Sequence, residues 1–511
     1  MANAINTIYE PECGTGKYIL TPPEPLFPRI NGASVFGVRM GSPFLYTIPA
    51  TGERPLHFSA EGLPEGLQLN AASGIISGAI ADRSHREHPV VLRAKNAHGE
   101  AEKKFTVVVG GTICLTPPMG WNSWNCWKVL VDQDKVLASA RAMVDKGLIN
   151  HGWSYVNIDD AWQGRRGGKY NAIQPDPSAF SDIGKVCDEI HAMGLKTGIY
   201  SSPWITTYAG RIGGSSDDSN GQWNAAVMAP AKMPEKKAFQ RVGAYVFDEN
   251  DAAQWAEWGI DYLKYDWKPN DPESTLRMAD ALKSCGRDIV YSLSNTAPLE
   301  HAELYGREVN CWRTAGDLKD RWDQKGPHLN LREQWELHRT WIEEGVRGGP
   351  GHFPDADMLV VGDVSTSHEG ELAPTNLTAD EQYAHISLWI LWACPLLIGC
   401  PIDTLDAFTL NLLTNAEVLD VHQDAVAVSG KSVRAADGNE IIVKDLADGG
   451  KAVGLFNLNA EPAVVELNWK GAGLRGPKTI RDLWRQKDVG VFENTFATRV
   501  QPNGVVLIRA T

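Results

Sequence analysis

Short β-type runs alternate with helical stretches eight times between residues 115 and 420. Many of the helical stretches end in glycine, at Gly147, Gly194, Gly259 and Gly345, as expected where a helix closes with a left-handed residue. Eight consecutive β–α units predict a (β/α)8 barrel. An open doubly wound sheet is the alternative, but it usually carries a glycine-rich phosphate turn after its first strand, and the sequence has none. The expected strands are MGWNSW, YVNIDD, KTGIYSS, IDYLKYD, DIVYSLS, EVNCWRT, a weak one near VRGGPG, and PLLIGC.

The two ends of the chain have a different pattern, with short strands, frequent Gly and Pro, and no helical periodicity. In residues 1–114, runs such as FLYTI and PVVLRA are separated by turn signals such as GLPEG, which predicts a small β-sandwich. Residues 421–511 contain EIIVKDL, KAVGLFNL and GVVLIRA and predict an antiparallel β-sandwich. The predicted architecture is multidomain α/β, with a (β/α)8 barrel (115–420) flanked by an N-terminal Ig-like β-sandwich (1–114) and a C-terminal antiparallel β domain (421–511).

Charge and residue usage narrow the range of partners. The 511 residues carry a net charge of −14, which argues against nucleic acid. No run approaches the ~20 apolar residues of a spanning helix, so membrane insertion is not expected. The eight Cys lack C-x-x-C spacing and the 13 His do not gather at strand ends, so neither a metal site nor a cofactor is expected. The start, MANAINTIYE, is not a signal peptide; the compartment stays open, and a secreted or periplasmic chain with its signal peptide removed fits.

Polar residues stand at the ends of several predicted barrel strands, where the chemistry of this fold is placed. They are Asp159 and Asp160 on strand two, Tyr200 on strand three, Lys264 and Asp266 on strand four, Ser294 on strand five, and Arg313 and Asp317 after strand six. A single Asp at a strand end is often only a helix cap. Consecutive strands ending in carboxylates or their partners are harder to explain by capping and favour a catalytic site.

Strand four carries a lysine and an aspartate in alternation. Period-two geometry puts Lys264 and Asp266 on one face, and an ammonium that close is expected to lower the pKa of the carboxyl, which suits a nucleophile. A structural ion pair has the same pattern. Glycoside hydrolysis needs a second carboxyl that gives a proton to the leaving oxygen, and configuration is retained when the two are about 5–5.5 Å apart. Asp266 and Asp317 can both reach the barrel mouth.

Seven ordered blocks resemble the signatures of glycoside hydrolase family 27, which contains the α-galactosidases and α-N-acetylgalactosaminidases. They are TPPMGWNSWN (116–125), YVNIDDAWQ (155–163), GLKTGIYSS (194–202), GIDYLKYD (259–266), CWRTAGD (311–317), DADMLVVG (355–362) and the run 377–400. The run LHFSAEGLPEGLQLNAASGIISGAI resembles the immunoglobulin-like domain often found ahead of bacterial carbohydrate enzymes. The resemblance implies an enzyme acting on α-galactoside oligosaccharides, polysaccharides or glycoconjugates, and leaves the oligomeric state open.

The resemblance also implies a role for each matching position. Asp266 is expected as the nucleophile and Asp317 as the acid/base of a retaining double displacement. Asp159 and Asp160 are expected to bind the 4- and 6-hydroxyls, and Arg313 a hydroxyl near the anomeric carbon. Further sugar-pocket positions match Trp121, Tyr200, Lys264, Ser294, Asp357 and Met358.

The sequence departs from the family pattern near the pocket. Trp267 and Lys268 follow Asp266, and no Cys lies between 188 and 284, so the family's disulfide between the loops after strands three and four is absent. The strand-three loop (206–247) is long and polar and is expected to reshape the rim and the leaving-group subsite.

Substrate preference stays open between related sugars. Ser294 and Ala297 in SLSNTAPLE are small, which suits an N-acetylgalactosamine substrate, although α-galactosidases are commoner in the family. A β-L-arabinopyranosidase ranks third, because both residues of the Asp159–Asp160 pair are kept. Two alternatives of other classes are a non-catalytic carbohydrate-binding barrel, which would have lost Asp266 or Asp317, and a metal-dependent hydrolase, which would need His at strand ends.

Overall fold

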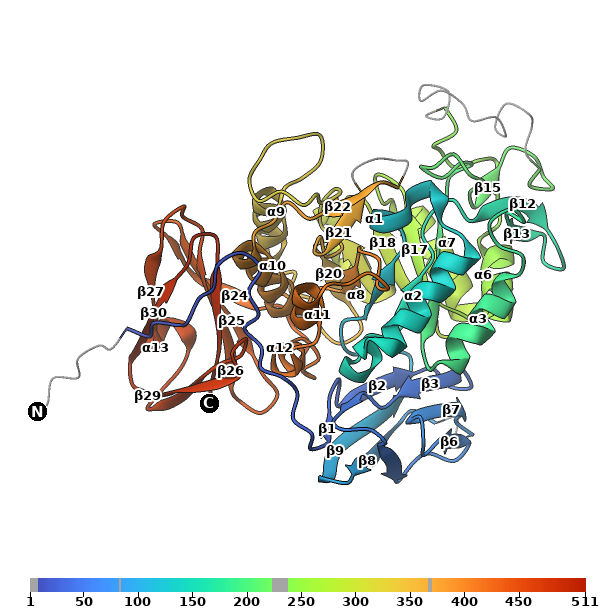
Figure 1. Cartoon of the computed structure of the whole chain (residues 1–511). Coiled ribbons are helices and arrows are strands. Elements are labelled where there is room, and N and C mark those ends of the chain that lie inside the picture. Colours follow the sequence, from blue (N-terminus) through green and yellow to red (C-terminus); the bar gives the residue numbers. More distant parts are fainter. Residues whose placement is uncertain (1–7, 82–83, 223–237, 366–369) are drawn as a thin grey trace, which may run out of the picture.

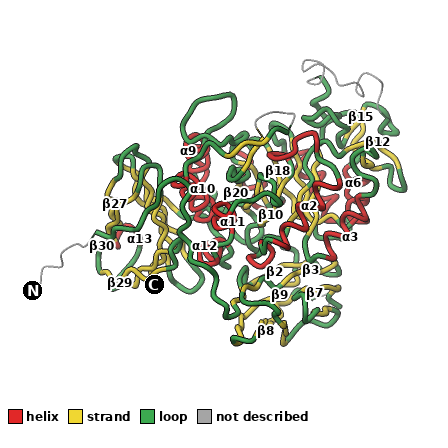
Figure 2. The backbone as a smooth tube through the Cα atoms, in the orientation of Figure 1, coloured by secondary structure: helices red, strands yellow, loops and turns green. Residues whose placement is uncertain are grey.

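The computed structural model describes residues 8–81, 84–222, 238–365 and 370–511. Its centre is a curled sheet of eight parallel strands with helices around it (Figures 1 and 2). The strands are β10 (Met119–Asn122), β11 (Tyr155–Asn157), β14 (Lys196–Ser201), β17 (Ile260–Asp266), β18 (Val290–Ser294), β19 (Cys311–Arg313), β20 (Phe353–Asp355) and β23 (Leu396–Ile398). Neighbours along the chain are neighbours in the sheet, and β23 pairs with β10, as in a (β/α)8 barrel.

The predicted barrel is confirmed, with one shift along the chain. The seventh strand is Phe353–Asp355, just beyond the VRGGPG run where it was expected. That run is a turn, because Gly348 and Gly351 both have positive φ. A parallel bridge between Leu359 and Ile398 joins the segment after β20 to β23 and closes the barrel.

Helices connect successive strands and begin at capping residues that the sequence supplies. Asp132 accepts a hydrogen bond from the N–H of Lys135, and both Asn330 and Thr378 form capping boxes with a Glu three residues later. The main helices are α2 (Gln133–Asp145), α3 (Ile183–Ala192), α6 (Asp248–Trp258), α7 (Pro272–Ser284), α8 (Ala302–Glu308), α9 (Leu331–Glu343) and α10 (Ala379–Leu391). Gly147, Gly194, Gly259 and Gly345 all have positive φ after these helices, as predicted.

The N-terminal unit is a two-sheet, Ig-like domain that lies against the amino-terminal end of the barrel (Figure 1). One sheet has the order β2 (Val35–Val38), β9 (Gly99–Val109), β8 (Arg86–Asn96), β5 (His57–Glu61), and the other β3 (Pro43–Thr47), β7 (Ile75–Ala79), β6 (Leu67–Leu69). Arg39 forms an ion pair with Asp288 at the start of β18, with Nε 2.7 Å from Oδ1. Thr47 Oγ1 donates to the carbonyl of Gly194 at 2.7 Å. The domain is therefore fixed to the barrel by polar contacts.

The C-terminal unit is an antiparallel β-sandwich that packs on α10. Its larger sheet has the order β24 (Lys431–Ala436), β25 (Asn439–Asp445), β26 (Lys451–Asn457), β31 (Val505–Ala510), β28 (Lys478–Asp482), β29 (Lys487–Phe492), and β27 (Ala463–Asn468) pairs with β30 (Thr495–Val500). Trp335 Nε1 of α9 donates to Glu440 of β25 at 2.8 Å.

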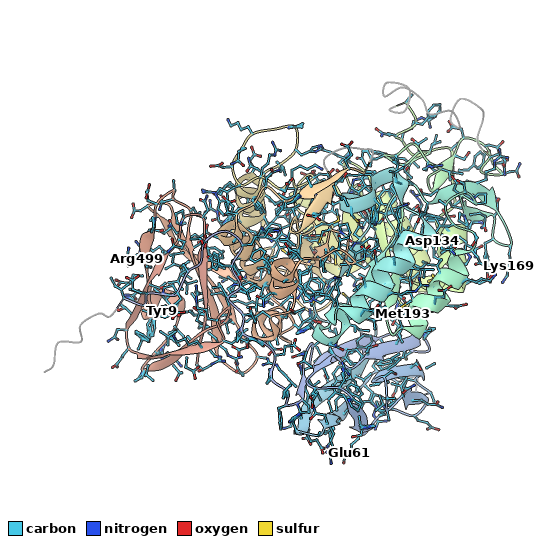
Figure 3. The ribbon with its side chains drawn as sticks, viewed as in Figure 1. Tyr9, Glu61, Asp134, Lys169, Met193 and Arg499 are labelled. Carbon is cyan, nitrogen blue, oxygen red and sulfur yellow. The ribbon has the colours of Figure 1, made fainter. Side chains whose placement is uncertain are left out.

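The first described residues run along this C-terminal domain before the chain enters the Ig-like domain (Figure 1). Tyr9 and Arg499 lie on the same domain (Figure 3), and the N–H of Arg499 donates to the carbonyl of Tyr9 at 3.0 Å. Tyr9 also donates its hydroxyl to Asp482 at 3.1 Å. This segment links the outer domain to the rest of the chain.

Candidate active site

The carboxyl ends of the barrel strands gather most of the predicted site residues in one buried cluster. Asp266 is the last residue of β17 and is 6% exposed, and Lys264 lies two residues before it. Asp159 and Asp160 follow β11, Tyr200 lies on β14, and Arg313 ends β19; all four are at most 4% exposed. Burial of this many charged groups at one end of a barrel requires close pairing, and their contacts show that pairing.

Asp266 is held by two donors. The hydroxyl of Tyr200 donates to Oδ2 at 2.8 Å, and the side-chain amide of Asn295 donates to Oδ1. Asn295 follows β18 directly and has a left-handed backbone, with φ of 62°, a conformation that Asn tolerates better than most residues. Sequence reasoning missed Asn295. The signal was its place in SLSN, one residue after the predicted Ser294.

Burial dominates the titration of Asp266. It raises the pKa of this carboxyl to about 7; Lys264 acts to lower it and the charge of Asp317 acts to raise it. The expected effect of the lysine has the right direction, but burial outweighs it. Lys264 does act in that direction, but its ion pair is with Asp159, with Nζ 2.7 Å from Oδ2.

Asp159 and Asp160 are oriented by different partners. Asp159 Oδ2 accepts from Lys264 and also from the side chain of Asn122, at 2.8 Å. Asp160 accepts two backbone N–H bonds, from Ala161 at 2.7 Å and from Ala209 at 2.8 Å. Burial nevertheless raises the pKa of Asp160 to about 6. The pair presents two fixed carboxyls side by side.

Ala209 belongs to the long loop after β14, so this loop reaches the bottom of the site as well as its rim. Tyr208 precedes Ala209, and burial first, and then the charges of Asp266 and Asp317, raise the pKa of its hydroxyl. Residues 223–237 of the same loop lie outside the described residues. The described part of the loop therefore contacts the predicted site through the N–H of Ala209.

Asp317 stands at the edge of the cluster, with 48% of its side chain exposed. Its Oδ1 lies 3.4 Å from Arg313 Nη2, and a β-bridge between Leu318 and Leu329 fixes the loop that carries it. Burial raises the pKa of Asp317, but the surrounding cations, Arg313 first and then Lys264, together outweigh it, so the net direction is downward. The charges of Arg313 and Lys264 act on both Asp266 and Asp317.

Arg313 is fixed on its other side by the segment after β20. Its Nη1 lies 2.7 Å from Asp357 Oδ1, and Asp357 Oδ2 accepts the N–H of Leu318, so one carboxylate orders both the arginine and the loop of Asp317. Asp357 has a φ of 84°, a strained conformation for a non-glycine residue. Met358 follows it and is 6% exposed. The DADMLVVG block (355–362) thus supports Arg313.

The remaining predicted residues line walls of the barrel interior. Trp121 is fully buried, and its Nε1 donates to the carbonyl of Cys400 at 3.0 Å. Ser294 and Ala297 are 3% and 2% exposed and bracket Asn295. Within the described ranges, no three His, Cys, Asp or Glu side chains are grouped so that they could hold a metal ion. No described helix is long and apolar enough to cross a membrane.

Comparison with known proteins gives the family. A family model described as alpha galactosidase A matches residues 116–229 and 231–424, and the alpha galactosidase C-terminal beta sandwich domain matches 436–510. A relative from Oryza sativa named alpha-galactosidase is 35% identical over 377 residues, which cover 72% of this chain and 78% of the relative. The chain belongs to the α-galactosidase family, glycoside hydrolase family 27. Residues 28–110 match the family model named "Putative Ig domain".

Two solved structures extend this assignment. A "putative alpha-galactosidase" from Bacteroides fragilis has a TM-score of 0.82 and 32% identity, with 95% of this chain and 98% of that chain covered. A family 27 β-L-arabinopyranosidase from Geobacillus stearothermophilus has a TM-score of 0.65 and 29% identity, with 78% and 97% covered. The first comparison covers all three domains, so this family 27 member shares its flanking domains with that protein as well as its barrel.

The departures from the family pattern have structural counterparts. Trp267 is buried at the end of β17, and its Nε1 donates to Asp271, the cap of α7, at 2.9 Å. Every cysteine of the chain is a free thiol. The strand-three loop is linked to the barrel by a hydrogen bond from Arg166, whose position is fixed by an ion pair with Asp251 of α6. Arg166 Nη1 lies 2.6 Å from Asp251, and Arg166 Nη2 donates to the carbonyl of Gly213 at 3.1 Å.

Proposed function

We propose that this family 27 enzyme is an exo-acting, retaining α-galactosidase in which Asp266 is the nucleophile and Asp317 the acid/base. The observation that carries the proposal is the unequal placement of the two carboxyls. Asp266 is buried and held by Tyr200 and Asn295, as suits a group that must attack one atom in one geometry. Asp317 is half exposed at the rim, where a leaving group departs and water enters.

The proposed reaction has two displacements at the anomeric carbon. In the first, an oxygen of Asp266 bonds to C1 of the galactosyl unit while the bond from C1 to the glycosidic oxygen breaks, and Asp317 transfers its proton to that oxygen. In the second, water attacks C1, the bond to Asp266 breaks, and Asp317 takes a proton from the water. The enzyme returns to its starting state with one proton on the pair.

The predicted binding residues supply the selectivity. Asp159 and Asp160 present acceptors to two neighbouring hydroxyls of the sugar. A sugar in which one of these hydroxyls has the inverted configuration would leave a buried carboxylate without a partner, so its binding is strongly disfavoured. Arg313 is held by Asp357 and can donate to a hydroxyl close to the reacting carbon. The proposed substrates are the terminal α-galactosyl groups of an oligosaccharide, polysaccharide or glycoconjugate.

The test compares two variants on p-nitrophenyl α-galactoside. Asp266→Asn and Asp317→Asn should each lower kcat by at least about a thousandfold at unchanged melting temperature, because each removes a group that forms or breaks bonds. Azide should restore part of the rate to Asp317→Asn by attacking C1 of the β-linked intermediate and displacing Asp266, and the product, identified by NMR, should be α-galactosyl azide. Near wild-type rates in either variant, or an inverted first-formed sugar, would refute the assignment.

An N-acetylgalactosamine substrate is the second candidate, favoured by the small, buried side chains of Ser294 and Ala297 beside the nucleophile. The rates on p-nitrophenyl α-galactoside, α-N-acetylgalactosaminide and β-L-arabinopyranoside, measured side by side, decide between the candidates. Ala297→Leu should lower the rate on the acetamido sugar more than the rate on galactose if the space beside these residues receives the 2-substituent.

A further inference from the structure

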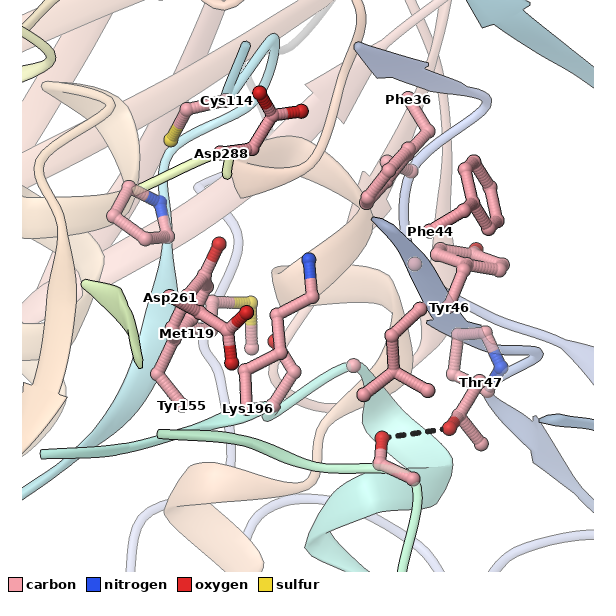
Figure 4. A pocket seen from close by; sticks show the side chains of 18 of the residues that line it. Phe36, Phe44, Tyr46, Thr47, Cys114, Met119, Tyr155, Lys196, Asp261 and Asp288 are labelled. Carbon is pink, nitrogen blue, oxygen red and sulfur yellow. Dashed lines mark hydrogen bonds between the residues drawn. The ribbon is translucent and has the colours of Figure 1, made fainter. Parts of the chain in front are cut away.

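A cavity of about 750 Å³ lies between the Ig-like domain and the amino-terminal end of the barrel (Figure 4). Met119, Tyr155 and Lys196 line it and are the first residues of β10, β11 and β14, whereas the predicted catalytic groups lie at the opposite ends of the barrel strands. Phe36 and Tyr46 contribute from the Ig-like domain. The cavity is therefore separate from the proposed active site, and both domains are needed to form it.

The carboxylates of the cavity already have partners. Asp288 Oδ1 accepts from Ser42 at 2.9 Å and pairs with Arg39. Asp261 pairs with Arg287 at 2.7 Å and also with His191 at 2.8 Å. These acidic side chains hold the domains and strands together, and their negative charge is compensated locally.

Lys196 differs from them, because within the described part of the chain its ammonium forms no hydrogen bond or ion pair. The nitrogen lies 4.5 Å from the centre of the Phe36 ring and 5.4 Å from that of Tyr155. In Figure 4 it stands between the aromatic residues of the Ig-like domain and Asp261, Met119 and Tyr155 of the barrel. Aromatic faces attract a cation but do not fill its three N–H donors.

A second donor in the lining is also unfilled. The hydroxyl of Tyr46 is buried and has no hydrogen-bond partner among the described residues. Its ring packs 5.4 Å from Phe36 and 4.7 Å from Phe105, measured between centroids, so its position is fixed by packing. The buried Tyr46 hydroxyl without a partner is costly, and the ammonium of the partly exposed Lys196 has donors free for a ligand.

We propose that this cavity is a second ligand site, which binds an acidic sugar through its carboxylate on Lys196 and Tyr46. The volume lies within the range of small-molecule sites, about 300–1,000 Å³, and accommodates a mono- or disaccharide. Leu45 and Leu69, which also line the cavity and are half-buried, offer apolar surface to the sugar ring, and the ammonium of Lys196 recognises the charge. A ligand that touches both domains stabilises their association, because it binds only when both are in place.

The test is calorimetric titration of the full chain with sodium D-galacturonate, in a constant saturating concentration of galactose so that the sugar pocket of the barrel is occupied. Neutral D-glucose, acetate and inorganic phosphate serve as comparison probes. Galacturonate should bind at one site per chain and more tightly than any of the three. Phosphate binding as tightly as galacturonate would overturn the assignment to a sugar, and the absence of galacturonate binding would overturn the site.

Variants locate the binding. Lys196→Met should weaken galacturonate binding by about tenfold or more, and Tyr46→Phe by about two- to tenfold, because each removes one donor to a charged acceptor. Lys185→Met on α3 is the matched control; its side chain is 80% exposed, and binding should be unchanged. Should Lys196→Met fold poorly, Lys196→Arg keeps the charge and should retain binding. Wild-type affinity in Lys196→Met or in Tyr46→Phe would refute the proposed contacts.

Discussion

Replacing Tyr200 by Phe isolates the bond that most directly stabilises the charge of the proposed nucleophile. The hydroxyl donates to Asp266 Oδ2 at 2.8 Å in a buried site and helps to lower the pKa of that carboxyl. A hydrogen bond to a charged group contributes about 1.5–3 kcal/mol, which corresponds to about one to two pH units in the pKa of its acceptor. Tyr200→Phe removes this contribution and leaves the ring in place.

The direction of the effect follows from how the two carboxyls share a proton. Burial raises the pKa of Asp266 to about 7, whereas Arg313 and Lys264 outweigh burial at Asp317 and lower its pKa. The singly protonated pair is the reactive form, because one group must be charged and the other must donate a proton. The Asp266–Asp317 pair loses its last proton near pH 7, so kcat/KM should fall as the pH rises through about 7.

Without the hydroxyl, the charged form of Asp266 is disfavoured and its pKa rises. The alkaline limb of kcat/KM for p-nitrophenyl α-galactoside should therefore move upward by about one to two pH units. The plateau value of kcat/KM should drop by about 10- to 100-fold, because in a smaller fraction of enzyme molecules the single proton lies on Asp317 and Asp266 is charged. Tyr265→Phe is the matched control, since its hydroxyl donates to Asp248 at 2.9 Å in an equally buried place. An unmoved alkaline limb in Tyr200→Phe, or an equal shift in Tyr265→Phe, would refute the reasoning.

Three further predictions concern stability and metal independence. Arg166→Met should lower the melting temperature, because it leaves the fully buried Asp251 without its partner, at a cost of about 3–5 kcal/mol; an unchanged melting curve would show that the pair is not needed. Gly198→Ala should destabilise the barrel by about 1–3 kcal/mol, since the new Cβ would lie 2.0 Å from Asn157 Oδ1; wild-type stability in urea unfolding would contradict this. Activity should survive excess EDTA, because the proposed chemistry needs only carboxyl groups; loss of activity that Zn²⁺ or Ca²⁺ restores would show otherwise.

The barrel could be predicted because its elements are local and repeated. Many of its helices have a capping residue at the start or a glycine after the end, and these signals lie within about 15 residues of one another. The seventh strand was misplaced for a physical reason. Phe353–Asp355 has only three residues, too few to show a period, whereas the preceding VRGGPG run shows the β-branched start and glycine-rich end of a strand and forms a turn.

The candidate site was predictable in its residue types but not in its hydrogen bonds. Strand ends could be read from sequence, and they indicated Asp266, Tyr200 and Arg313. Asn295 and Ala209 could not be found in this way, because one acts through a left-handed backbone and the other through an N–H group on a long loop. Neither property has a sequence signature as strong as a carboxylate at the end of a strand.

The partner of Lys264 shows where strand alternation stops being informative. Alternation correctly places Lys264 and Asp266 on one face, but residues two apart on a strand are separated by about 6.6 Å along it. In a closed barrel, inward side chains from alternate strands share a layer. Lys264 on β17 therefore reaches past β14, over the ring of Tyr200 at 5.5 Å, to Asp159 after β11. With the lysine paired across the barrel, burial decides the pKa of Asp266, and the proton that the reaction needs stays on the carboxyl pair near neutral pH.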